Sequence, residues 1–160
     1  YGGFGTSLRF YGVDFSIGFT YQLGGQVLDQ GYMFYMNSPA GTSTGNNYHH
    51  DLLNSWTPEN SGSNIPRFAY NDSNQAAVSD RFLTSASYLN IQNITLGYTL
   101  PKRITRKFLV ENLRIYLACD NVWYWSKRQG LDPRQSINGI TNPYYYAPIR
   151  TFSGGVTVTF

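Results

Sequence analysis

The final stretch of the chain has two chemically different faces. Residues 150–160 read Arg-Thr-Phe-Ser-Gly-Gly-Val-Thr-Val-Thr-Phe. Side chains of a β-strand alternate between its faces, so Phe152, Val156 and Val158 share one side while threonines and a serine share the other. In a water-soluble sandwich the apolar face packs on a core, whereas in a membrane barrel it faces lipid and the hydroxyls line a wet lumen. This strand alone fits both architectures.

The same alternation recurs along the chain, and it predicts strands at residues 2–11, 13–23, 85–100, 112–125 and 150–160. One of these strands changes phase. Leu89 and Ile91 lie on one face of it, and Ile94 and Leu96 on the other. This switch predicts either a β-bulge near Gln92 or a strand that rises above the membrane with its lower half in lipid. The sequence therefore predicts an all-β, antiparallel fold.

The connections between these strands alternate between short and long. Tyr11-Gly12 and a basic connector at residues 102–107 are short, while residues 24–80 and 126–148 are long and rich in Gly, Ser, Asn and Pro. In the longer loop only residues 48–56 suggest a short helix. Transmembrane barrels combine short periplasmic turns with long extracellular loops. Five antiparallel strands cannot close a barrel, so further strands must come from elsewhere.

Composition excludes several classes of protein. Charged residues make up 13% of the chain, against roughly a quarter in typical globular proteins, and aromatic residues reach 17%. The net charge of +3 comes from scattered residues, so we expect no nucleic-acid partner. No apolar run reaches the roughly 18 residues of a transmembrane helix. Cys119 is the single cysteine, which excludes an internal disulfide.

Aromatic residues near the strand ends are expected to sit at the two membrane interfaces, where such rings are enriched. The expected interface residues are Phe10, Tyr11, Phe15, Tyr21, Tyr98, Trp123, Trp125 and Phe152. Phe160 ends the last predicted strand and resembles the terminal aromatic by which outer-membrane barrels are recognised for assembly. We therefore expect Phe160 to be an assembly signal.

Several motifs along the whole chain are familiar in order and spacing. They are GGFGTSL at 2–8, FTYQLGG at 19–25, WTPEN at 56–60, YLNIQNITLGYTLP at 88–101, GLDP at 130–133 and RTF at 150–152. Together they resemble the C-terminal end of the SusC/RagA-like TonB-dependent outer-membrane transporters. The resemblance implies the last five strands of a 22-stranded, plugged transmembrane β-barrel with long extracellular loops.

The resemblance also implies a function and a set of partners. Family members import oligosaccharides or peptides across the outer membrane of Gram-negative bacteria. Expected partners are the plug and remaining strands of the same transporter, a SusD-like surface lipoprotein, TonB through an N-terminal part outside this chain, and outer-membrane lipid. The segment alone is not expected to transport anything.

Candidate substrate-binding residues follow from parity and from loop position. Tyr116 and Tyr124 fall on the lumen-facing side of their strand, whereas Trp123 and Trp125 fall on the outward side. Trp56, Tyr144 and Tyr145 lie in the long loops. There they are suited to glycan binding, to contact with the lipoprotein, or to packing within the loop.

No catalysis, metal or cofactor is predicted. In His49-His50-Asp51, adjacent histidines are expected to point to different sides of a helix, and no third ligand has suitable spacing. The carboxylates form neither a calcium pattern nor an acid/base pair. Two other classes remain open: a secreted all-β carbohydrate-binding module with a soluble core, and a small self-assembling pore.

Overall fold

The computed structural model describes residues 1–39, 45, 47–128, 130–135, 138–142, 144 and 146–160. The chain divides into two compact units. The sheet unit comprises Tyr1–Gly25, Ala86–Gln129 and Tyr146–Phe160, and the loop unit comprises Gln26–Ser85 and Gly130–Tyr145. Within the described residues, no helix is long and apolar enough to cross a membrane.

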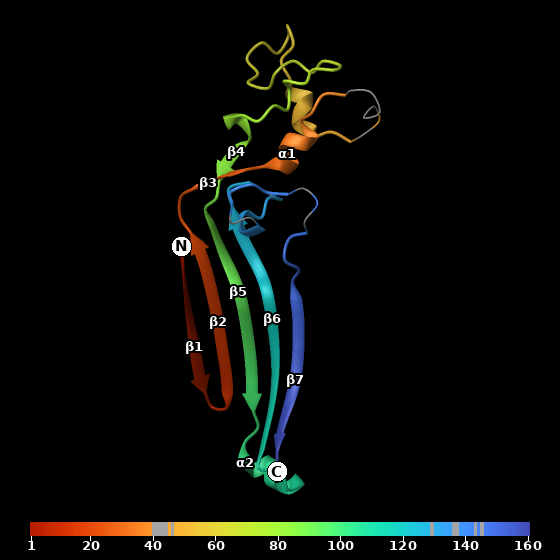
Figure 1. Ribbon diagram of the computed structural model, residues 1–160. Helices are drawn as coiled ribbons and strands as arrows, with labels where there is room; N and C mark the ends of the chain where they lie inside the picture. The colour runs from red at the N-terminus through yellow and green to blue at the C-terminus, as the bar shows by residue number, and fades with distance from the viewer. Residues whose placement is uncertain (40–44, 46, 129, 136–137, 143, 145) are drawn as a thin grey trace. The chain divides into compact units, whose positions relative to one another are not determined.

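The sheet unit is one antiparallel sheet in which each strand pairs with its neighbour along the chain (Figure 1). Its five strands, in spatial order, are β1 Gly2–Phe10, β2 Val13–Gln22, β5 Tyr88–Thr99, β6 Asn112–Ser126 and β7 Thr151–Thr159. The all-β, antiparallel prediction is confirmed. One expected boundary was wrong: β5 begins at Tyr88 rather than at residue 85, because residues 83–85 form a separate strand in the loop unit.

Both short connections are tight. Tyr11 and Gly12 have φ values of 47° and 87°, the left-handed pair that a two-residue hairpin requires. A Cβ on Gly12 would lie 2.6 Å from the carbonyl oxygen of Thr99, so only glycine fits there. The other turn contains the short helix α2, Lys102–Thr105, and the 3₁₀ turn η4, Arg106–Phe108. Leu109 ends it with a φ of 57°.

The phase change in β5 arises from a bulge. Asn93 pairs with Gly18 and Ile91 pairs with Phe19, so Gln92 is skipped in the pairing with β2. Gln92 is also skipped in the pairing with β6. The extra residue returns Leu89 and Ile91 to the same face as Ile94, which confirms the predicted bulge.

The register separates the sheet into an apolar and a polar face. One row across all five strands reads Leu8, Phe15, Leu96, Leu117 and Gly154, and the adjacent row reads Ser7, Ser16, Thr95, Ala118 and Ser153. None of the described residues covers the apolar row, since Leu8 is 62% exposed and Leu117 is 65% exposed. Among the described apolar residues of this unit, only Ala86 is buried.

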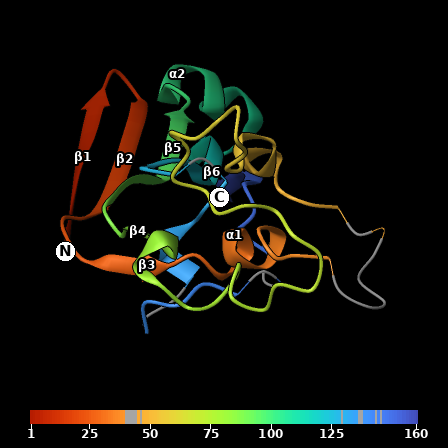
Figure 2. The same ribbon diagram turned by 90° about the horizontal axis from the view of Figure 1, so that it is seen from above.

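The loop unit has its own small core. Strands β3 Gln26–Leu28 and β4 Leu83–Ser85 pair antiparallel and lie side by side in Figure 2. Around them are helix α1 Gln30–Tyr35 and the 3₁₀ turns η2 His50–Asn54, η3 Asp80–Phe82 and η5 Pro133–Gln135. The buried apolar residues of this unit are Val27, Met36, Phe82 and Leu131. Within the stretch 48–56, where a short helix was expected, only His50–Asn54 form a 3₁₀ turn, while α1, β3 and β4 were not predicted.

Backbone hydrogen bonds join the two long connections within the loop unit. The Leu28 N–H donates to the carbonyl oxygen of Gly139 at 2.7 Å, and the Thr141 N–H donates to that of Leu28 at 3.1 Å. Leu28 and Ile140 therefore form a parallel bridge. The two long loops therefore fold together as one unit.

Candidate functional site

An ion pair lies on the polar face of the sheet. Arg114 of β6 donates to Asp14 of β2 through Nε at 3.0 Å and through Nη2 at 2.5 Å, a bidentate arrangement. The guanidinium reaches across β5 at Gly97, where a Cβ would lie 2.5 Å from Asp14 Oδ2. Sequence reasoning missed this pair because its partners are 100 residues apart. The available signal was that both charges fall on the polar side of their strands.

Tyr116 and Tyr124 lie on this polar face, as their parity predicts. Tyr116 pairs with Gly155, and its ring covers that glycine, since an added Cβ would lie 2.7 Å from the ring. Tyr124 pairs with Asn90, which is 3% exposed and donates to Thr20 Oγ1 at 3.1 Å. Eight residues along one strand separate the two tyrosines by about 26 Å, so the structure does not bring them together.

The loop unit contains a recess of 360 Å³ with a neutral lining. The lining residues are Gln30, Met33, Phe34, Asn37, Ala76, Asn142 and Tyr144. Phe34 and Tyr144 meet edge to face, with ring centroids 6.5 Å apart. Of the two predicted loop residues that the structure describes, Trp56 and Tyr144, only Tyr144 lines this recess. The amides and Phe34 were not predicted, because nothing in the local sequence indicates that segments so far apart meet.

Trp56 lies away from this recess. Trp56 is 38% exposed, and its backbone N–H donates to the carbonyl oxygen of Ile65 at 2.8 Å. It does not line the recess. Tyr145 lies outside the described residues. Substrate binding by any of these side chains remains a prediction.

A second recess, of 520 Å³, is almost entirely apolar and lies on the apolar face of the sheet. Its apolar lining comes from Phe4, Tyr21, Leu23, Leu89 and Trp125. Two expected interface aromatics, Tyr21 and Trp125, therefore line one surface hollow.

Five other expected interface aromatics are exposed on this unit, namely Phe10, Tyr11, Tyr98, Trp123 and Phe152, while Phe15 is half-buried. Phe160 lies just beyond β7 and is 88% exposed. Their interfacial and assembly roles remain predictions.

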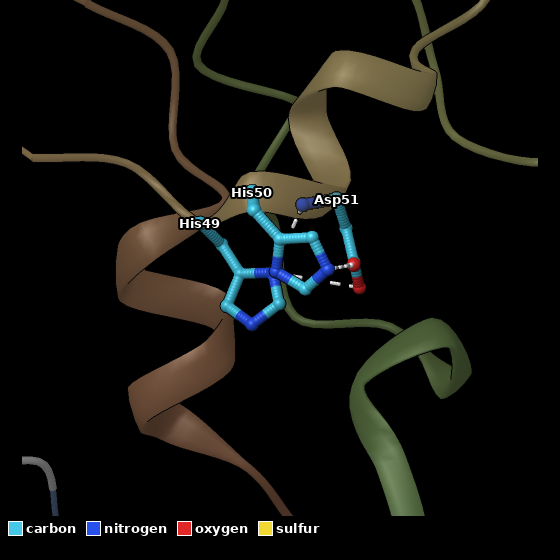
Figure 3. Close-up of side chains that lie close together, drawn as sticks. All are labelled: His49, His50 and Asp51. Carbon is cyan, nitrogen blue, oxygen red and sulfur yellow. Dashed lines mark hydrogen bonds and ion pairs between the residues drawn. The ribbon is translucent and has the colours of Figure 1, made fainter.

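His49, His50 and Asp51 lie close together, contrary to the expectation that the two imidazoles point to different sides (Figure 3). The imidazole ring centroids are 4.8 Å apart. His49 Nδ1 is 3.4 Å from Asp51 Oδ2, and His50 Nε2 is 3.0 Å from Asp51 Oδ1. The expectation was wrong because it assumed helical geometry. His49 is instead the extended residue before η2, with φ −69° and ψ 140°.

Comparison with known proteins shows which proteins this chain is similar to in sequence. No family model matches it. TonB-dependent receptor P3 of Formosa agariphila is 26% identical over 99% of the chain and 16% of its own length. TonB-dependent receptor SusC of Bacteroides thetaiotaomicron is 36% identical over 52% of the chain and 8% of its own length. This chain is a homologue of the TonB-dependent receptors, SusC among them. The resemblance seen in the sequence is confirmed.

Solved structures agree on the fold. The RagAB peptide importer in its closed-closed state matches 99% of the chain with a TM-score of 0.83 at 24% identity. A second RagAB structure matches with a TM-score of 0.82. The chain spans about one sixth of these longer proteins, 16% of receptor P3 and 17% of the matched RagAB chain. Its relatives are receptors and transporters rather than enzymes, as predicted.

Proposed function

We propose that this chain supplies part of the barrel wall and the extracellular loops of an outer-membrane nutrient importer in a Gram-negative bacterium. The observation that carries this proposal is the sheet unit, whose apolar face is continuous across five strands yet covered by no protein core. Lipid is the solvent that such a face requires. A secreted carbohydrate-binding module would need a core beneath the same face, which argues against that alternative.

The rest of the barrel is expected from the same receptor. Among the described strands, β1 and β7 each pair on one side only, and unpaired strand edges favour further pairing. In this proposal the remaining strands of a 22-stranded barrel complete both edges, and this chain forms the last five strands. The plug and the TonB-contacting part belong to the same larger protein.

The two long connections leave the sheet at one end. Gln22 at the end of β2, Tyr88 at the start of β5 and Ser126 at the end of β6 are in register. The short turns lie at the opposite end of the strands. Barrels of this class place long loops outside the cell and short turns in the periplasm. The loop unit is thus assigned to the extracellular mouth, where a SusD-like lipoprotein would dock.

The neutral recess of the loop unit supports binding of an uncharged ligand group at this mouth. Three amides converge there with Phe34 and Tyr144, a combination that hydrogen-bonds to polar groups and packs on a flat apolar surface. A sugar ring of an oligosaccharide and a polar segment of a peptide both meet these requirements. Import of one of these two substrate classes is the function we propose.

The test is growth of a strain that lacks the full-length receptor on a panel of neutral oligosaccharides and peptides as sole nutrient. We expect growth on at least one of them to be lost and then restored by the wild-type gene. Complementation with Tyr144→Ala should restore it poorly, whereas Tyr146→Ala, an exposed tyrosine outside the recess, should restore it fully. Undiminished growth of the deletion strain on every member of the panel would refute the proposed import.

The lipoprotein partner is tested separately by co-purification. Removing residues 41–64 from the full-length receptor should leave the barrel assembled while reducing the amount of surface lipoprotein recovered with it. If the shortened receptor recovers as much lipoprotein as the wild type, this loop is not part of the docking surface.

A further inference from the structure

We propose that His49, His50 and Asp51 form a binding site for a divalent transition-metal ion such as Zn²⁺. The three side chains supply two imidazole nitrogens and a carboxylate, and one ligand atom from each lies within 4.8 Å of the others. Two atoms bound to one tetrahedral Zn²⁺ lie about 3.4 Å apart, since Zn–N and Zn–O bonds are about 2.0–2.2 Å long. Side-chain rotations that shorten the separations by up to about 1.4 Å therefore bring all three atoms into coordination range.

The carboxylate is already held in a position that suits metal binding. Tyr32 of α1 donates from its hydroxyl to Asp51 Oδ2 at 2.9 Å. Its ring meets His49 edge to face with centroids 4.7 Å apart, and it packs against Phe82, which is 1% exposed. A hydrogen-bonded outer shell of this kind orients metal ligands and strengthens binding. Tyr32 thus ties both His49 and Asp51 to the core of the loop unit.

The site is open to solvent on one side. The His50 side chain is 80% exposed, while those of His49 and Asp51 are about one third exposed. An ion can enter directly, and three protein ligands leave a fourth position for water or for a donor group of another molecule. This is the ligand arrangement of an open site rather than of a closed structural one.

The donor set selects the kind of metal. Imidazole nitrogen with carboxylate oxygen suits Zn²⁺, Ni²⁺ and Cu²⁺, whereas Ca²⁺ and Mg²⁺ prefer oxygen ligands alone. Binding replaces interactions within the cluster, the 3.0 Å contact between His50 Nε2 and Asp51 Oδ1 among them. His49 Nδ1 accepts a hydrogen bond from the Asp51 N–H at 3.2 Å, and coordination through this nitrogen replaces that long bond.

The experiment uses full-length receptor purified without a histidine tag and treated with a chelator, titrated with Zn²⁺ by calorimetry. The wild type should bind one more equivalent of Zn²⁺ than the variant with His49→Gln and His50→Gln. Asp80→Asn, which removes an exposed carboxylate elsewhere in the loop unit, should retain that equivalent. Equal stoichiometry in the wild type and the double variant overturns the proposal.

Tyr32→Phe tests the role of the outer shell. This substitution keeps the ring that packs on His49 and removes only the hydroxyl that holds Asp51. We expect the same stoichiometry with an affinity about 10-fold to 100-fold weaker. An unchanged affinity would overturn the role assigned to Tyr32. The limited-proteolysis pattern of each variant shows whether the loop unit is still folded.

Discussion

The sheet unit and the loop unit bury their apolar side chains in different ways. The loop unit encloses Val27, Met36 and Phe82, each 1% exposed or less. The sheet unit is larger and more regular, yet it leaves Leu8 and Leu117 more than 60% exposed. One chain therefore contains a region with its own apolar core and a region whose apolar face is left uncovered by the described residues. We therefore expect exposed leucines in the two regions to differ in how well they tolerate a charged substitution.

The largest expected effect comes from placing a charge on the outward face. Leu117→Arg in the full-length receptor should abolish barrel assembly, because arginine on the lipid face near the midplane costs about 2–4 kcal/mol. Leu53→Arg in the loop unit should be tolerated. Leu53 is 89% exposed, so exposure alone would predict the same tolerance at both leucines. Ala118→Ser, on the polar face beside Leu117, should also be mild. Heat-modifiable electrophoretic mobility measures assembly in all three variants.

Equal loss of assembly in the two arginine variants would show that exposure, and not the face of the sheet, decides tolerance. Tolerance of Leu117→Arg would contradict the lipid-facing assignment itself. Either result would remove the distinction between the units on which the proposed function rests.

An intermediate effect is expected from the core of the loop unit. Phe82→Ala should destabilise that unit by about 3–5 kcal/mol, because the substitution empties a fully buried site. The barrel should still assemble, since Phe82 belongs to the core of the loop unit. Limited proteolysis of the assembled receptor should show faster cleavage within residues 26–85. Phe68→Ala, at a 39% exposed site in the same unit, is the matched control and should change cleavage little.

The two units also differed in how far sequence could predict them. Alternation of apolar and polar residues has the period of a strand, so it indicated all five strands and their faces, including the bulge that restores Ile91 to the apolar face. Helix α1 has no such period over its six residues. Its local signal was Asp29, whose carboxylate caps the helix by accepting from the Tyr32 N–H at 2.9 Å. Capping residues are common in loops and were too weak a signal on their own.

The candidate sites were harder to predict than the strands for a related reason. Parity places Tyr116 on a face but does not indicate that its ring lies over Gly155. The neutral recess joins segments more than 100 residues apart, and the local sequence does not encode that contact. The histidine pair was misjudged because helical geometry was assumed for a residue that precedes the turn. Contacts between distant or irregular segments depend on tertiary structure, which periodicity does not report.

The smallest expected effect concerns the glycines of the two units. On the polar face, Gly97 leaves room for the Asp14–Arg114 ion pair, and a Cβ there would lie within 2.6 Å of both side chains. Gly62 in the loop unit has no neighbouring atom within 4 Å of an added Cβ. Gly97→Ala should therefore lower the thermal stability of the detergent-solubilised receptor slightly, whereas Gly62→Ala should be neutral or stabilising.

The cause of the Gly97 effect can be isolated by removing the ion pair first. A receptor that carries Asp14→Asn and Arg114→Gln lacks the ion pair that holds the two side chains over Gly97. Both side chains can then move away from a new methyl group. Gly97→Ala should then cost less than it does in the wild type, and a double-mutant cycle measures that difference. If the cost is the same in both backgrounds, the glycine serves the backbone of β5 rather than the ion pair.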